Sequence, residues 1–138
     1  MRNIDLQADE PVFVPAILEA MFGDAHGVIA TVLETFCTSM DQQMQLLQAA
    51  RAAGDTLSQQ QIAHRIKGAA RMSGALALAQ AAEQLEQVAR SAPIGSSLQD
   101  CRGAVSESVL LRWLQLEGDA LFLSARRGDS GNNLRGHG

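Results

Sequence analysis

Apolar residues recur along most of this chain at steps of three and four, the spacing that places side chains on one face of an α-helix. The clearest stripe follows Asp24 and consists of Ile29, Leu33, Phe36, Met40, Met44 and Leu47. Asp24 is suited to cap the start of this helix, and Gly54 is suited to end it. The pattern therefore predicts one long amphipathic helix between Gly23 and Gly54.

Shorter helices are expected on both sides of it. Pro11 suits the first turn of a helix through PVFVPAILEAMF, because the first turn leaves its N–H groups unpaired, and Gly23 ends that helix. Thr56 and Gln59 have the spacing of a capping box. This spacing predicts a third helix that runs to about Ser73.

Two more helical segments follow Gly74. The first carries small or apolar residues at steps of four, three and four, namely Leu78, Ala82, Leu85 and Ala89. Pro93 and Gly95 close it, and Ser96 with Gln99 repeats the capping-box spacing. The segment that then begins has one apolar side, formed by Leu98, Cys101, Val105, Val109, Trp113 and Leu116.

Short connections between consecutive long amphipathic helices make neighbouring helices antiparallel. We therefore expect an all-α fold, an antiparallel up-down-up-down four-helix bundle with a short additional N-terminal helix across one end. The bundle should occupy residues 11–125, preceded by a linker at 1–10. Residues 126–138, RRGDSGNNLRGHG, have no apolar period and are expected to be a disordered tail.

Composition narrows the class of protein. Only 4% of the 138 residues are aromatic and there is no Tyr, which favours helices over a β-sandwich. A net charge of −4 does not indicate nucleic-acid binding. Cys37 and Cys101 lie far apart without metal-ligand spacing, so neither a disulfide nor a zinc site is indicated. With no signal peptide and no apolar run of about 18 residues, we expect a cytoplasmic monomer without direct membrane contact.

The stretch AHRIKGAARMSGA in the third helix contains the chain's most distinctive chemistry. At 100° per residue, one group of side chains falls on the side opposite the core position Ile66: His64, Lys67, Gly68, Arg71 and Ala75. Gly in an exposed helix interior costs about 1 kcal/mol relative to Ala, and a merely solvated His does not explain it. A missing side chain beside the imidazole leaves room for a partner or its phosphoryl group.

Positive charge gathers around this His. Arg65, Lys67 and Arg71 place three of the eleven cations of an acidic chain within seven residues. Such a cluster is usually only a solvated face. However, Lys67 is one turn from His64 and is placed to neutralise a phosphate, which carries close to two negative charges. Arg71 is placed to meet either a phosphate or an acidic partner, and Arg65, beside Met72, is peripheral or structural.

The stretch resembles the motif of histidine-containing phosphotransfer (HPt) domains, H-x-[LI]-K-G-[AS]-[AS]-x-x-x-G-[AG], at every specified position. Asp55, nine residues before His64, and the pair Leu85 and Glu86 on the next helix also fit the family. The resemblance covers about residues 24–92. It is greatest to the C-terminal HPt modules of unorthodox hybrid sensor kinases, such as the Bordetella-type virulence sensor, in which a receiver domain would precede this module.

The resemblance implies a phosphorelay. A receiver domain's phospho-aspartate would transfer its phosphoryl group to Nε2 of His64, and the receiver of a response regulator would take it in turn. Lys67 would stabilise the phosphate charge and Gly68 would provide steric clearance, with Arg71 in support. Imidazole suits this relay because it is a nucleophile at neutral pH.

The resemblance also suggests supporting and docking residues. Glu86 lies where HPt domains often carry Gln or Glu, and either orients the imidazole, directly or through water, or is a solvated helix acid. Arg90, one turn later, has the same two interpretations. A receiver presents a small apolar surface beside its Asp, so we expect Ala63, Ala75 and parts of the second helix to form an apolar collar, with Arg65 at its edge.

We expect the module to bind no cofactor itself and the receiver to supply Mg²⁺. The chain has no Gly-rich nucleotide loop and no P-loop lysine, so it has no kinase activity of its own, although it would be part of a histidine kinase in a hybrid sensor. Two alternatives stay open: a non-catalytic adaptor bundle that docks a receiver without transfer, and a metal-binding bundle that uses His64. The metal alternative is weak because His26 and His137 lie at a helix start and in the tail.

Overall fold

The computed structural model describes residues 10–91 and 97–128, and this part of the chain is helical, without strands. Its helices are α2 (Pro15–Phe22), α3 (His26–Ala53), α4 (Thr56–Ser73), α5 (Leu76–Ser91), α6 (Ser97–Glu117) and α7 (Ala120–Arg127). The prediction of an all-α fold is confirmed.

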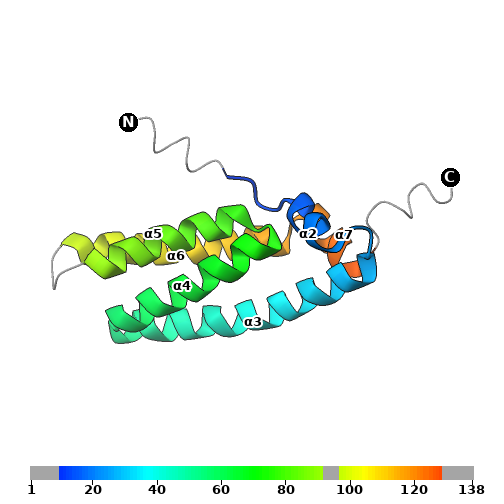
Figure 1. Ribbon diagram of the computed structural model, residues 1–138. Coiled ribbons are helices and arrows are strands. Elements are labelled where there is room, and N and C mark those ends of the chain that lie inside the picture. Colours follow the sequence, from blue (N-terminus) through cyan, green and yellow to red (C-terminus); the bar gives the residue numbers. More distant parts are fainter. Residues whose placement is uncertain (1–9, 92–96, 129–138) are drawn as a thin grey trace.

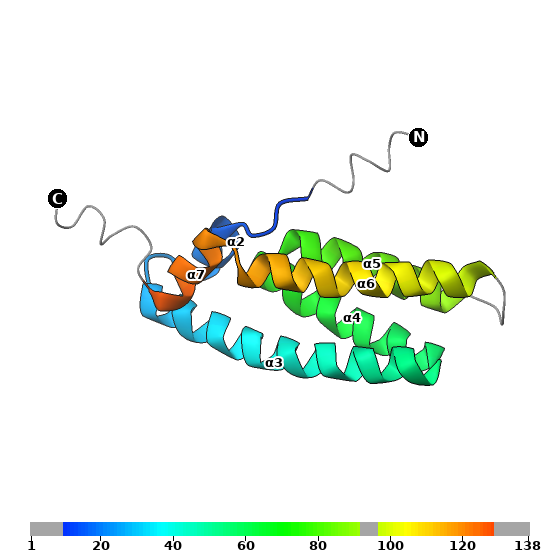
Figure 2. The same cartoon turned by 180° about the vertical axis from the view of Figure 1, so that it is seen from behind.

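The four longer helices lie alongside one another, and the short helices α2 and α7 lie together at one end of them (Figures 1 and 2). Contacts run from α3 to α4, from α4 to α5, from α5 to α6, and from α6 back to α3. In Figure 1, α3 passes into α4 at the end far from α2, whereas α4 passes into α5 at the end near α2. The helix that carries His64 is therefore flanked by α3 and α5.

The predicted apolar stripes form the core of the molecule. Every member of the stripe on α3 is buried, and so are Leu78, Ala82, Leu85 and Ala89 on α5. On α6, Val109, Trp113 and Leu116 are buried, whereas the side chains of Leu98 and Cys101 lie outside the described part. Burial raises the pKa of the Cys37 thiol to about 12, so this group stays protonated inside the core.

The first two helices begin later than the sequence pattern suggests. α2 starts at Pro15 instead of Pro11, and Pro15 takes the first-turn position expected of Pro11. The residues between them are not helical because their backbone bonds to the turn between α4 and α5. Asp24 does not cap α3, since the residue that precedes the first turn is Ala25 and no side chain caps this end.

The start of α4 is set by Asp55. Its carboxylate accepts a hydrogen bond from the backbone N–H of Ser58 at 3.0 Å, so Thr56 is the first helical residue and the predicted capping box is wrong. Gln59, the other expected member of that box, is buried and accepts a hydrogen bond from the hydroxyl of Ser106 on α6 at 3.3 Å. The predicted end at Ser73 is confirmed, with Gly74 in the left-handed conformation at φ 89°.

The sequence pattern did not predict α7. α6 ends at Glu117, and Asp119 then caps a new helix by accepting hydrogen bonds from the N–H groups of Leu121 and Phe122. α7 runs to Arg127, two residues into the segment expected to be a tail. Gly128 ends α7 in the left-handed conformation, and residues 129–138, most of the expected linker and the turn residues Pro93, Gly95 and Ser96 lie outside the described residues.

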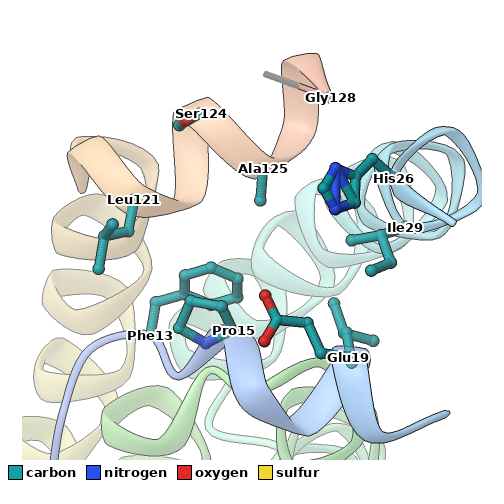
Figure 3. Close-up of a pocket in the computed structure, with 10 residues that line it drawn as sticks. Phe13, Pro15, Glu19, His26, Ile29, Leu121, Ser124, Ala125 and Gly128 are labelled. Atoms are coloured by element: carbon teal, nitrogen blue, oxygen red, sulfur yellow. The ribbon is translucent and has the colours of Figure 1, made fainter. Parts of the chain in front are cut away.

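An aromatic cluster joins the two short helices to the bundle. Phe122 of α7 packs edge-on against Phe13 and Phe36, with ring centroids 5.3 and 6.5 Å away, and Phe36 packs against Trp113 of α6 at 6.0 Å. Beside this cluster, α2, α3 and α7 surround a cavity of about 190 Å³. Figure 3 shows Phe13, Pro15 and Glu19 on one side of it and Ala125 with His26 on the other.

Candidate functional site

His64 lies in the middle of α4 and is open to solvent, with 68% of its side chain exposed. The turn at Gly74 and Ala75 returns the chain along α4, so that α5 packs against it. This arrangement brings Glu86 of α5 to the His64 ring, with the carboxylate oxygen Oε2 2.9 Å from Nδ1. Of the two interpretations of Glu86, the direct contact with the imidazole is the one found.

Glu86 is the centre of a small network of charges. Only 6% of its side chain is exposed, and Arg90 donates a hydrogen bond to Oε2 at 2.9 Å, one helical turn away. Lys67 places its ammonium 2.7 Å from the other oxygen, Oε1. Within the described part of the chain no hydrogen bond of standard geometry reaches Oε1, so the ion pair with Lys67 provides its electrostatic compensation.

These contacts keep the Glu86 carboxylate ionised. The Lys67 ammonium lowers the pKa of Glu86 below its usual value, the contact with His64 acts in the same direction, and burial opposes both. An ionised carboxylate only accepts hydrogen bonds, so the proton of a neutral imidazole must lie on Nδ1. The lone pair of the ring then lies on Nε2, the nitrogen that Glu86 does not contact.

Gly68 has no packing role within the described part of the chain. A Cβ built on it would meet no atom within 4 Å outside its own helix backbone. The residue is exposed and lies one turn after His64 on the surface of α4. The missing side chain therefore leaves open space beside the imidazole.

The other two predicted cations contact neighbouring helices. Arg71 forms an ion pair with Glu83 of α5, with Nη2 of Arg71 2.6 Å from Oε1 of Glu83, and both side chains are partly exposed. Arg65 donates a hydrogen bond from Nε to the side chain of Gln43 on α3 at 3.3 Å. The three cations of α4 therefore have different partners: Lys67 contacts Glu86, Arg71 contacts Glu83 and Arg65 contacts Gln43.

The expected apolar collar of Ala63 and Ala75 is not present, because both residues are fully buried. Ala63 lies one turn before Lys67, on the side of α4 that α5 covers. The helical wheel placed Ala75 beside His64, but the helix ends at Ser73 and the left-handed Gly74 redirects the chain. Neither Ala is accessible to a partner.

Glu83 was not among the predicted site residues. Glu83, Glu86 and Arg90 follow one another at steps of three and four, which places them on one face of α5. That spacing could have indicated that α5 presents a charged face to the cations of α4.

The described residues contain neither a metal-binding cluster nor a membrane-spanning helix. Within residues 10–91 and 97–128, no group of three or more His, Cys, Asp and Glu side chains is arranged to hold a metal ion. None of the helices in the same ranges combines the length and the apolar character needed to cross a bilayer.

Comparison with known proteins gives one match. The family model described as the Hpt domain matches residues 31–120, which is more than half of the chain and includes His64, Lys67, Gly68 and Glu86. Searches of curated proteins and of solved structures gave no significant match. The chain therefore belongs to the Hpt domain family, whose members interact with receiver domains in the phosphorelays of two-component signalling.

Proposed function

We propose that this chain is a phosphorelay intermediate. It accepts a phosphoryl group from the phospho-aspartate of one receiver domain onto Nε2 of His64 and passes that group to the aspartate of a response regulator. The 2.9 Å contact between Nδ1 and Glu86 carries the proposal, because it leaves the lone pair on the other nitrogen of an exposed ring.

The transfer needs no proton movement at the ring. The Nε2 lone pair attacks phosphorus, the N–P bond forms, and the bond from phosphorus to the aspartyl oxygen breaks, so that the receiver carboxylate leaves with the electron pair. The imidazole keeps its proton on Nδ1 and becomes cationic. Glu86 faces that proton, so its negative charge stabilises the phosphorylated ring. Transfer to the second receiver is the reverse of these steps.

The cations around Glu86 support the phosphoryl group. Lys67 lies one turn from His64, and its ammonium and the His64 ring contact the two oxygens of the same carboxylate. Arg90 contacts the same carboxylate from α5. We propose that both cations stabilise the phosphoryl charge, with Arg71 meeting the acidic pocket of the receiver.

Exposed apolar residues form the proposed docking surface in place of the buried alanines. Leu57 and Met72 on α4 are 62% and 63% exposed, and Leu46 on α3 is 49% exposed. Leu57 lies two turns before His64, on the same side of α4. A shallow depression lined by Leu46, Ala53 and Arg65 runs between the two helices. We propose that the apolar surface of a receiver packs here, in a small and transient interface.

The resemblance to HPt domains of hybrid sensor kinases supports further proposals about the metal ion, the location and the parent protein. We propose that the receiver supplies Mg²⁺, that the module is a cytoplasmic monomer without kinase activity of its own, and that its parent is a hybrid sensor kinase. The connection of successive long helices at alternating ends supports an antiparallel up-down-up-down four-helix bundle as the topology.

The proposal is tested by incubating the chain with a radiolabelled phospho-receiver and Mg²⁺. We expect the wild-type chain to acquire an acid-labile, base-stable label, and His64→Gln to acquire none. His26→Gln is the matched control, because His26 lies at the start of α3, remote from Glu86, and should leave labelling unchanged. Label retained by His64→Gln would contradict the assignment. A wild-type chain that binds the receiver but is never labelled would favour the adaptor alternative.

A further inference from the structure

Four residues before α2 lie across the turn between α4 and α5, and we call Pro11–Val14 the strap. The N–H of Val14 donates a hydrogen bond to the carbonyl of Gly74 at 2.8 Å. The N–H of Ala77, in the first turn of α5, donates to the carbonyl of Pro11, also at 2.8 Å. The strap therefore bonds to the end of α4 and to the start of α5 at once.

Gly74 is fitted to this contact in two ways. Its φ of 89° is a backbone conformation that residues with a side chain rarely adopt. In addition, a Cβ at this position would collide with the carbonyl oxygen of Val14. Gly54 ends α3 with a φ of 68°, but a Cβ there would meet nothing within 4 Å. Among the described residues, another segment crosses Gly74, and none crosses Gly54.

The strap is anchored on its other side by the aromatic cluster. Phe13 is 6% exposed and its ring packs edge-on against Phe122 of α7. Both residues lie outside residues 31–120, the part matched by the family model. The strap thus connects the α4–α5 turn to Phe122 of α7, which lies outside the residues matched by the family model.

The turn between α4 and α5 affects the site because His64 lies on the helix before it and Glu86 lies on the helix after it. His64 and Glu86 each lie about ten residues from the turn, or about 15 Å along their helices. A change of about 5° in the angle between the helices would displace Glu86 from His64 by on the order of 1 Å. That displacement is enough to break a hydrogen bond of 2.9 Å. The packing of α4 against α5 and the pair of Lys67 and Glu86 oppose such a change along the helices, whereas the strap opposes it at the turn.

We propose that the strap is a positioning element of the relay site, which holds the angle between α4 and α5 and thereby keeps Glu86 on Nδ1 of His64. The role of His64 in this statement rests on the proposed function. The strap touches neither the imidazole nor the carboxylate, and acts on them only through the two helices.

The test compares Gly74→Ala with Gly54→Ala in the full chain. Both substitutions place a side chain at a left-handed position next to α4, but only the first also displaces the strap. Heteronuclear NMR of the imidazole nitrogens reports which one of His64 carries the proton, and this measurement requires no phosphotransfer. We expect the proton on Nδ1 in the wild-type chain and in Gly54→Ala, and a mixture of the two tautomers in Gly74→Ala. Transfer from a phospho-receiver should slow by about tenfold in Gly74→Ala alone.

Val14→Pro is the second variant, and it removes the N–H that bonds to Gly74 while leaving the turn residues unchanged. It should reproduce both effects, with helical circular dichroism retained. The strap has no positioning role, and the proposal is wrong, if Val14→Pro keeps the wild-type tautomer and transfer rate and Gly74→Ala, provided that it folds, keeps them too. A wild-type chain that accepts no phosphoryl group would refute the proposed function instead, and the tautomer comparison would still decide the role of the strap.

Discussion

Glu86 shows how one residue can organise a site without being exposed. Its carboxylate contacts His64, Lys67 and Arg90, which come from two helices. A buried carboxylate without partners would be costly, and each contact both offsets that cost and fixes the position of a group needed at the surface. The exposed chemistry of the module therefore depends on a residue that solvent hardly reaches.

The contacts of Glu86 should make stability depend on pH. Because its pKa in the folded chain is below the ordinary value of 4.5, ionised Glu86 stabilises the fold above about pH 4.5, and this contribution is lost as the pH falls through the folded pKa. We therefore expect Glu86→Gln to lower the midpoint of thermal unfolding near neutral pH, by an amount that shrinks in acid.

Thermal unfolding followed by circular dichroism across this pH range measures the effect. Glu83→Gln is the control, because it changes a more exposed acid of the same helix and should shift the midpoint little at any pH. A difference between the wild-type chain and Glu86→Gln that stays constant down to acidic pH would contradict the argument.

Gly68 should lower the stability of the folded chain and favour phosphotransfer to His64. A Cβ at this position meets open space, so Gly68→Ala is expected to stabilise the chain by about 1 kcal/mol through helix propensity alone. Gly68→Gln should slow phosphotransfer while the helical circular dichroism stays intact, because its longer side chain occupies the clearance beside His64. Urea unfolding and the labelling assay measure the two effects separately. Unchanged transfer in Gly68→Gln would disprove the clearance argument.

At the scale of elements, each long helix could be predicted because it has its own buried stripe. α7 could not, because a helix of eight residues with Phe122 as its buried residue gives no periodic signal. Helix starts were less predictable than helix ends. A Gly in the left-handed conformation marks an end on its own, whereas Ser, Thr and Asp compete for neighbouring capping positions, as Asp55 and Thr56 do.

The site was predictable wherever one helix determines it. The pattern placed His64 and Gly68 correctly on the exposed side of α4 because both lie within one continuous helix. Lys67 was expected on the same side, but only 18% of its side chain is exposed because its ammonium contacts Glu86 of α5. Ala75 was misplaced because the wheel was extended past Gly74, where helical geometry ends. The strap could not be predicted, since its backbone hydrogen bonds leave no mark in the residue types of residues 11–14.

Helix caps give a direct test of the observed element boundaries. Asp119→Ala removes the acceptor for two backbone N–H groups at the start of α7 and should destabilise the chain by about 1 kcal/mol. Asp24→Ala, at the position where the sequence predicted a cap, should change stability by less than about 0.5 kcal/mol. Urea unfolding of the two variants distinguishes these outcomes, and equal losses would mean that Asp24 caps α3 after all.

At the scale of the whole molecule, the folded unit extends beyond the family match at both ends. Phe13 and Phe122 lie outside residues 31–120, yet both are buried against each other and against the long helices. The fold of this chain thus includes the strap and α2 before the matched region and nearly all of α7 after it.

Phe122 should be among the most sensitive positions for stability. Its side chain is fully buried, so Phe122→Ala is expected to cost about 3–5 kcal/mol, both from lost burial and from the cavity left behind. Leu121→Ala is the neighbouring control, since Leu121 is 57% exposed and should cost far less. Chemical denaturation of both variants checks this, and a small effect at Phe122 would mean that α7 is peripheral to the fold.

The three contacts of Glu86 also bear on the reversibility of the relay. Before transfer, the two cations and the carboxylate leave the site with one net positive charge beside a neutral ring. A doubly negative phosphoryl group on a cationic ring brings the same set of groups to neutrality. In the proposed relay, neither state would contain a large unbalanced charge, so the site would trap neither the free nor the phosphorylated histidine. Such a balance suits a group that must give up its phosphoryl as readily as it takes it.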